Sequence, residues 1–327
     1  MKSFQYVDTS FEPLSNEHRY FYSSFFQKVE TYSHNKNILL LYRGTMYSNI
    51  QERLDNSDLN ENNIFNRAFY FGEKARFCSN EKIKDTMQVL FKDINDCSFS
   101  TLKKVFDEIE SLLSEQRLRL QVKSRLSPSF KRYFKRPENR NLFASIINNI
   151  ECSKTKLLLR DYYLYLLHTG YTIKYHTPLV STSIKRSEAK NFKKMKNKDE
   201  KIIFHYFVPE ALTNSIIAPW KISTILEVVS TYKLPHYIPE GLFPKQKEIT
   251  VKGGLFPQFI LGIELVDKEQ FIVNPYLINY TSSDFDNILK VGILFDQSDF
   301  GNKILKTNYA YSTLMNDSGY VSSKPIS

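Results

Sequence analysis

The stretch Gly241–Gly254, GLFPKQKEITVKGG, decides how we interpret the rest of the chain. Glycines and a proline mark its ends, and apolar and polar residues alternate over Glu248–Lys252. A period of two is typical of a half-buried strand, so we predict a strand there. The same period places Gln246 and Glu248 on one side and Lys247 on the other. An amide and a carboxylate then face the same way at the start of a strand, although a solvated hairpin end would show the same pattern.

The composition indicates a folded, basic protein. The chain has 327 residues, of which 42% are hydrophobic and 14% aromatic, and its net charge is +10. This hydrophobic content supports a core and excludes a disordered chain. The positive charge favours acidic partners such as nucleic acid, anionic lipid or a phosphorylated cofactor, but it can equally serve solubility.

Cysteine usage and the N-terminus bear on the compartment. Cys78, Cys97 and Cys152 are odd in number and far apart, which fits neither a disulfide framework nor a zinc site. We therefore expect a reducing compartment and no metal. The N-terminal MKSFQYVDTSFEPL has no apolar segment, and no apolar run in the chain is long enough to span a membrane. We expect a soluble protein without an N-terminal signal peptide.

A continuous apolar run upstream, Ile38–Leu41, predicts a buried strand that ends in Tyr42-Arg43-Gly44. Arginine is suited to bidentate phosphate contacts, and glycine lets a ligand approach the backbone closely. The alternative is an arginine held in a structural salt bridge. Before this strand we predict a loosely attached arm over residues 1–12 and a helix from Ser15 to about Tyr32.

Residues from Met46 to about Leu167 read as helices, because apolar residues recur at spacings of three and four. One part of this block, residues 117–136, is basic and interleaved with aromatic residues. It could be a solvated helix face, a site for an anionic partner or membrane surface, or a nucleic-acid site. The basic residues are Arg117, Arg119, Lys123, Arg125, Lys131, Arg132, Lys135 and Arg136.

Strand patterns dominate after Gly170, which makes the fold class α+β. The strand Leu179–Ser183 ends in three hydroxyl residues that can hold a carboxylate or a ribose, although hydroxyls on an edge strand are common. A short helix from Ser187 to about Lys194 follows and carries Phe192. The remaining predicted strands are Tyr171–Lys174, Ile202–Val208, Phe259–Leu265, Phe271–Val273 and Leu289–Phe295.

Three motifs in this order resemble the Arg–Ser–Glu class of mono-ADP-ribosyltransferases, the family of binary bacterial toxins and vertebrate ecto-enzymes. They are Tyr42-Arg43-Gly44, Ser181-Thr182-Ser183 and Gln246-Lys247-Glu248. The resemblance covers about 38–49 and 171–275. It implies a split β-sandwich core with a large helical insertion between the Arg strand and the Ser-Thr-Ser strand.

The resemblance also implies roles for single residues in cleaving NAD+, the co-substrate. Arg43, Gly44, Thr182, Ser183 and Phe192 would bind NAD+, with Phe192 stacked on nicotinamide. Glu248 would stabilise the oxocarbenium-like ribose, Ser181 would orient Glu248, and Gln246 would orient the acceptor. The target-facing loop would comprise Phe243, Lys245 and Lys247. A glutamine two residues before the glutamate favours an acceptor other than arginine, because an amide is not a base.

We therefore expect a protein mono-ADP-ribosyltransferase, a bacterial effector or toxin that reaches a host cytoplasm and modifies a host protein. An NAD+ glycohydrolase and an inert module that binds through the basic helical block are the alternatives. A nucleic-acid modifier of the same fold is a further one, supported by the net charge of +10 alone. The expected domains are an N-terminal arm and helix (1–37), a catalytic core (38–49 and 170–300), a helical insertion that binds a target or partner (50–169) and a tail (301–327).

Overall fold

A computed structural model describes most of the chain, and every structural statement below concerns the residues that it describes. These are residues 4–34, 39–55, 62–73, 96–114, 118–170, 179–191, 199–208, 216–217, 222–237, 242–243, 247–252, 255 and 259–277.

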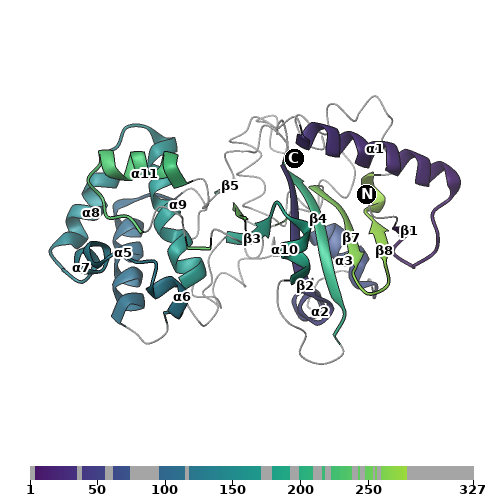
Figure 1. Ribbon diagram of the computed structural model, residues 1–327, viewed down its shortest axis with the longest axis horizontal. Helices are drawn as coiled ribbons and strands as arrows, with labels where there is room; N and C mark the ends of the chain where they lie inside the picture. Colours follow the sequence, from purple (N-terminus) through teal and green to yellow (C-terminus); the bar gives the residue numbers. More distant parts are fainter. Residues whose placement is uncertain are drawn as a thin grey trace, which may run out of the picture. The chain divides into compact units, whose positions relative to one another are not determined.

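Contacts divide the chain into two compact units, and we describe each by itself. The sheet unit comprises Met1–Asn80, Val180–Ile216 and Gly253–Ser327, and the helical unit comprises Glu81–Leu179 and Ile217–Lys252. Figure 1 labels most of the elements of both.

These boundaries differ from those of the domains expected from the sequence. The expected core was 38–49 and 170–300, with an insertion of 50–169. In the structure, the described residues up to Glu73 belong with the sheet, and the described residues within 217–252 belong with the helices. The roles assigned to the domains stay predictions.

The strands of the sheet unit lie in the order β1–β8–β7–β4–β2–β3. The pairing of β1 with β8 is parallel, and the other pairings in this series are antiparallel. This mixed sheet, with most helices in a separate block of the chain, is compatible with the predicted α+β class. The strands are β1 (Gln5–Val7), β2 (Leu39–Met46), β3 (Leu179–Ser183), β4 (Lys201–Val208), β7 (Ile260–Leu265) and β8 (Gln270–Val273).

The strand β1 was not predicted, because residues 1–12 were expected to form a loose arm. Instead Gln5–Val7 adds an edge strand beside β8, and Val7 is fully buried. Ring contacts hold it there: the centroid of Tyr6 lies 5.4 Å from that of Tyr22 and 5.7 Å from that of Phe271. Three residues are too few for a period, so the sequence gives no strand signal here.

The helix α1 (Asn16–His34) covers one face of the sheet. It begins as predicted, because the backbone N–H of His18 donates to Ser15 Oγ at 3.2 Å. Its buried side includes Phe25 and Phe26, whose rings lie 6.4 Å from Phe207 and 6.3 Å from His205 of β4. The sheet unit also contains α2 (Tyr47–Leu54), α3 (Ile64–Phe71), α10 (Arg186–Asn191) and the 3-10 turn η5 (Pro275–Leu277).

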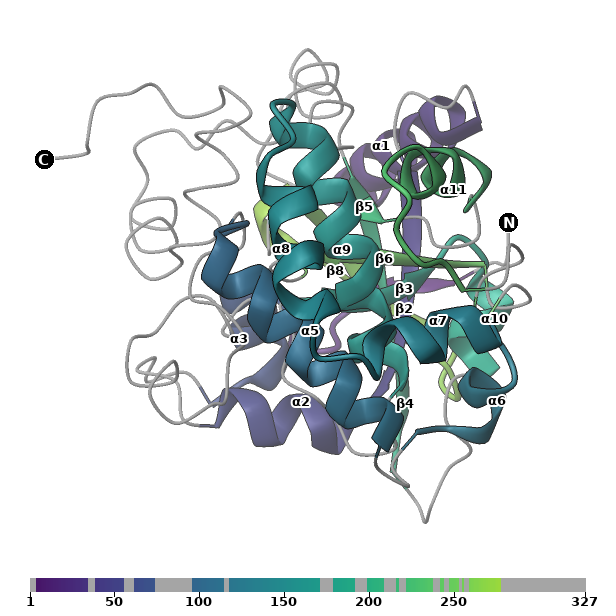
Figure 2. The same cartoon turned by 90° about the vertical axis from the view of Figure 1, so that its left-hand side faces the viewer.

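The helical unit is built around α9 (Ser153–Gly170), which contacts α5, α8 and α11 (Figure 2). Each residue of α9 from Leu159 to Leu167 is buried, so this part of the helix has no solvent-exposed face. No described helix is both long and apolar enough to cross a bilayer. The other elements of this unit are α5 (Phe99–Ser114), α6 (Leu120–Lys123), α7 (Pro128–Phe134), α8 (Asn139–Asn148), α11 (Ile222–Thr231) and β6 (Glu248–Lys252). In the sequence, the two-residue strand β5 (Ile216–Ile217) spans the boundary between the units.

Candidate functional site

Arg43 lies inside the strand β2 and not at its end. The ladder between β2 and β4 continues past Arg43, with Thr45 opposite Ile202 and Met46 opposite Lys201. The prediction of a strand that ends in Tyr42-Arg43-Gly44 is therefore wrong about the end. Polar Thr45 hid the continuation, but backbone pairing with β4 does not depend on the side chain.

Two hydrogen bonds fix the buried guanidinium of Arg43. Its Nη1 donates to the backbone carbonyl of Ser181 at 2.7 Å, and its Nε donates to Glu73 Oε2 at 2.6 Å. The strands β2 and β3 pair with Tyr42 opposite Ser183. The structure thus brings together the Arg motif and the Ser-Thr-Ser motif, which the sequence separates by 138 positions at Arg43 and Ser181.

Glu73 is one of two residues of the candidate site that the sequence analysis missed. Its side chain is buried against Arg43, and its backbone exchanges hydrogen bonds with Leu255 at 3.0 and 2.9 Å. Gly72 before it has a φ of 74°, a conformation that favours glycine. The ion pair between Arg43 and Glu73 is the structural salt bridge that the sequence analysis considered as the alternative role of Arg43. No local pattern around Glu73 indicates this pairing, because its partner is distant in sequence.

Gly44 is required by packing. A Cβ atom at this position would overlap the backbone carbonyl oxygen of Ala189, on α10. Because α10 packs onto β2 here, no larger residue fits without a shift of that helix. This is a structural reason for the glycine, besides the cofactor role that the resemblance implies.

The three hydroxyl residues of β3 differ in their surroundings. Ser181 is partly exposed, whereas Thr182 and Ser183 are buried. Ser183 Oγ accepts a hydrogen bond from the backbone N–H of Lys185 at 3.0 Å, which holds the turn into α10. Phe192, the predicted stacking residue, lies outside the described residues.

Glu248 begins β6 of the helical unit, as predicted, and its side chain is buried. The hydroxyl of Tyr165, on α9, donates to Glu248 Oε2 at 2.5 Å. Burial and the negative charge of Glu248 raise the pKa of Tyr165 well above its usual value, so Tyr165 stays a proton donor. The sequence analysis missed Tyr165, because its hydroxyl looks like one of many within an apolar helix.

The strand β6 is more buried than its alternating pattern predicts. Thr250 was expected on the polar side, yet its side chain is fully buried and its hydroxyl has no hydrogen-bond partner among the described residues. Ile249 and Val251 are buried on the other side. The side chains of Glu248 and Thr250 face the same side of the strand, and both are buried. Two polar side chains therefore lie next to each other on a buried face of β6.

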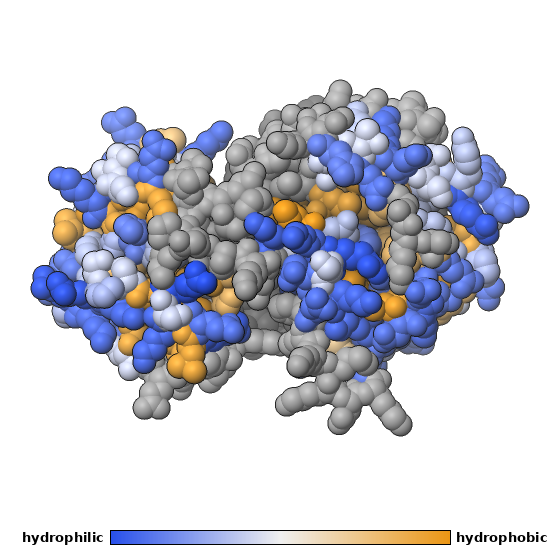
Figure 3. All heavy atoms as spheres, in the orientation of Figure 1, coloured by the Kyte–Doolittle hydropathy of each residue, from blue (hydrophilic) through white to orange (hydrophobic). Residues whose placement is uncertain are grey.

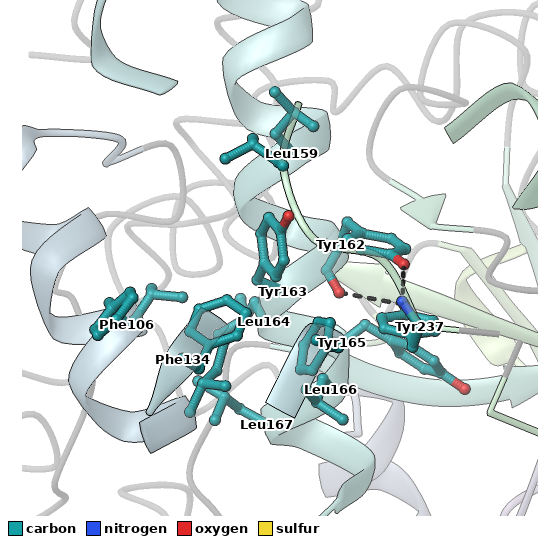
Figure 4. Packing of buried hydrophobic residues seen from close by; sticks show 14 of the residues in the cluster. Phe106, Phe134, Leu159, Tyr162, Tyr163, Leu164, Tyr165, Leu166, Leu167 and Tyr237 are labelled. Atoms are coloured by element: carbon teal, nitrogen blue, oxygen red, sulfur yellow. Dashed lines mark hydrogen bonds between the residues drawn. The ribbon is translucent and has the colours of Figure 1, made fainter. Parts of the chain in front are cut away.

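A stack of tyrosines lies beside Tyr165 (Figure 4). The rings of Tyr162 and Tyr237 are parallel within 6°, with centroids 4.2 Å apart. The backbone N–H of Tyr237 donates to the Tyr162 hydroxyl at 3.0 Å, and the hydroxyl of Tyr237 donates to the backbone carbonyl of Tyr162 at 3.3 Å. These contacts join α9 to the segment that precedes β6.

The predicted target-facing loop is only partly described. Gln246 and Lys245 lie outside the described residues. Lys247 adopts a positive φ of 47°, and Phe243 is half-buried against the helical core. Only part of the Phe243 ring is therefore left to contact a target.

A second buried polar cluster lies in the sheet unit. Glu264 accepts from Arg186 Nε at 2.7 Å and from a second Arg186 nitrogen, and it contacts His205 Nε2 at 2.9 Å. Burial opposes the charge of Glu264, but the bonds to His205 and Arg186 prevail and lower its pKa to about 2. Burial lowers the pKa of His205. The cluster fixes α10 to β4 and β7.

The described residues contain no group of three or more His, Cys, Asp or Glu side chains that could hold a metal ion. Comparison of the chain with protein-family models, with curated proteins and with solved structures finds no match.

Proposed function

We propose that this protein is an NAD+-dependent protein mono-ADP-ribosyltransferase, with the sheet unit as its split β-sandwich core. The observation that carries the proposal is the contact between Arg43 on β2 and Ser181 on β3. Their two motifs are distant in sequence, and they are two of the three motifs that carry the resemblance to that family. The third motif of the resemblance contributes Glu248, whose side chain is buried at the start of β6.

The chemistry needs few groups, because nicotinamide leaves as a neutral molecule. The bond between ribose C1′ and the nicotinamide nitrogen breaks, and the bonding pair stays on that nitrogen. An acceptor atom of a protein then bonds to C1′ and loses its proton. The protein has to hold NAD+, stabilise positive charge on the ribose and position the acceptor.

Arg43 is proposed to hold a phosphate of NAD+. Its Nε and Nη1 already donate to Glu73 and Ser181, so a phosphate would contact the remaining nitrogen, Nη2. A guanidinium held at two positions loses little further freedom when it binds an anion. Thr182, Ser183, Gly44 and Phe192 complete the proposed cofactor-binding residues.

Glu248 is proposed to bind the ribose 2′-hydroxyl and to stabilise the oxocarbenium-like ribose. Ser181 would orient it, and Tyr165, whose hydroxyl lies 2.5 Å from Glu248 Oε2, fixes the carboxylate from α9. Gln246 would orient the acceptor. We further propose that the protein is a bacterial effector that modifies a host protein. This part of the proposal rests on the family resemblance alone.

The test is incubation of the purified protein with labelled NAD+ and a cell lysate. We expect a labelled protein band that disappears with Glu248→Gln, a variant that keeps the shape of the side chain and removes its charge. Glu227→Gln is the matched control, because Glu227 is exposed on α11 of the same unit. Release of nicotinamide without a labelled band would favour an NAD+ glycohydrolase. Equal labelling by both variants would refute the proposed role of Glu248, and no turnover of NAD+ would refute the function.

A further inference from the structure

The segment 119–136, which contains α6 and α7, carries a large positive charge. No acidic residue occurs between Gln116 and Pro137. Seven basic side chains of this segment are described, and each is exposed or partly exposed. They are Arg119, Lys123, Arg125, Lys131, Arg132, Lys135 and Arg136. We call them, together with Leu120, the basic α6–α7 surface.

None of these seven side chains forms an ion pair with a described residue. The acidic residues that form ion pairs within the helical unit contact other arginines, as Asp107 contacts Arg140 and Asp161 contacts Arg160. The amino group of Lys131 instead donates to the backbone carbonyl of Lys123 at 3.1 Å, which ties α7 to α6. Within the part of the chain that the structure describes, these charges are therefore open to an external partner.

The aromatic residues of the segment point away from that surface. Phe130 and Phe134 are fully buried in the helical core, and Ser127 caps the start of α7 by accepting from the N–H of Phe130 at 3.1 Å. Tyr133 packs partly against the same core. The two phenylalanine rings that could have stacked on nucleic-acid bases are thus committed to packing.

One large apolar side chain instead protrudes among the charges. Leu120, the first residue of α6, is 82% exposed and lies between Arg119 and Lys123 in the sequence. Figure 3 shows that the described surface in view is mostly hydrophilic, with scattered apolar residues. A protruding leucine beside unpaired basic residues is the combination by which a protein rests on an anionic bilayer.

We propose that the basic α6–α7 surface docks on anionic membrane surfaces, with Leu120 entering the headgroup region. The basic side chains contact lipid phosphates and carboxylates, and Leu120 moves out of water. A nucleic acid would use the same charges but would leave Leu120 exposed and would find neither phenylalanine ring for stacking. The proposal does not depend on the transferase activity.

The test is co-sedimentation of the full chain with phosphatidylcholine vesicles that either contain or lack phosphatidylserine. We expect binding only to the anionic vesicles, weakened by added salt. Lys123→Gln/Arg132→Gln should weaken it about 25-fold, because each basic residue near such a surface contributes about fivefold. Leu120→Ser should weaken it roughly tenfold without changing the charge.

The matched control is Lys104→Gln/Lys154→Gln, which removes the same charge from exposed positions of the helical unit outside the surface. It should bind nearly as well as the unchanged chain. Equal loss in both double variants would reduce the effect to net charge and overturn the proposal. So would equal sedimentation with both kinds of vesicle, or tight binding to RNA or single-stranded DNA without binding to vesicles.

Discussion

At the scale of single residues, the pair of Arg43 and Glu73 shows how two charges can be retained in a protein interior. Both side chains are nearly inaccessible to water, and Arg43 donates a further hydrogen bond to the Ser181 carbonyl. Burying one charge alone is far more costly than burying a hydrogen-bonded pair. The two residues therefore depend on each other.

Glu73→Gln should lower the free energy of unfolding by about 3 kcal/mol, because the charge of Arg43 is then buried without a counter-charge. Urea denaturation measures this. The control is Asp107→Asn, which removes the more exposed ion pair between Asp107 and Arg140. That pair is solvated, so its loss should cost less than about 1 kcal/mol. Equal losses in the two variants would contradict the importance assigned to Glu73.

Tyr165→Phe removes the hydroxyl that donates to Glu248 and leaves the rest of the ring in place. We expect the free energy of unfolding to fall by about 2 kcal/mol, because a buried carboxylate loses a donor. In the proposed reaction, kcat should fall while KM for NAD+ changes little, since Tyr165 acts through Glu248. Tyr20→Phe, at an exposed position on α1, is the control and should leave both quantities unchanged.

At the scale of elements, α10 packs so closely on β2 that position 44 of β2 has room only for glycine. Gly44→Ala should lower the free energy of unfolding by about 2 kcal/mol, because a backbone carbonyl, and not a side chain, blocks the new methyl group. Thermal and urea unfolding measure this.

The comparison variant is Gly170→Ala, whose methyl group would meet the Leu112 side chain at 3.0 Å. A leucine methyl can move, and alanine is the better helix former, so this variant should cost little or nothing. A Gly44→Ala protein as stable as Gly170→Ala would show that α10 can shift at no cost.

The sequence predicts those elements best whose local pattern agrees with their packing. The predicted bounds of β3 and β6 are those observed, and α1 begins at its predicted cap. The helix α11 was missed, because Ile222–Thr231 is rich in β-branched residues and is held as a helix by its contact with α9.

The candidate site is predictable only in part. Arg43, Ser181 and Glu248 were identified from their motifs, and the structure places Arg43 against Ser181. Glu73 and Tyr165 were not identified, since each acts through a partner that is remote in sequence. Contacts of this kind depend on tertiary packing, which no period or cap encodes.

At the scale of the whole molecule, the cluster of Glu264, Arg186 and His205 should make the free energy of unfolding fall at acidic pH. The pKa of Glu264 is about 2 in the folded chain, against an ordinary value of 4.5. A depressed carboxyl pKa stabilises the folded state above pH 4.5, and this contribution of about 3 kcal/mol is lost as pH falls through 2.

Unfolding measured from pH 6 down to pH 2 with Glu264→Gln as the comparison isolates this contribution. The unchanged chain should lose stability more steeply below pH 4.5 than Glu264→Gln does. His205, whose pKa is lowered by burial, adds a loss that begins at higher pH, below its ordinary value of 6.5. Parallel curves below pH 4.5 would contradict the role of Glu264.

The way in which the chain alternates between its two units restricts the order in which they can form on a ribosome. The chain leaves one unit for the other after Asn80, Leu179, Ile216 and Lys252. A nascent chain can assemble α5 to α9 early, but α11 and the strand that carries Glu248 emerge much later. The strand β2 likewise has to wait for β4. The helical unit therefore remains incomplete until Lys252 has been synthesised, and the sheet unit until the segment after Gly253 follows.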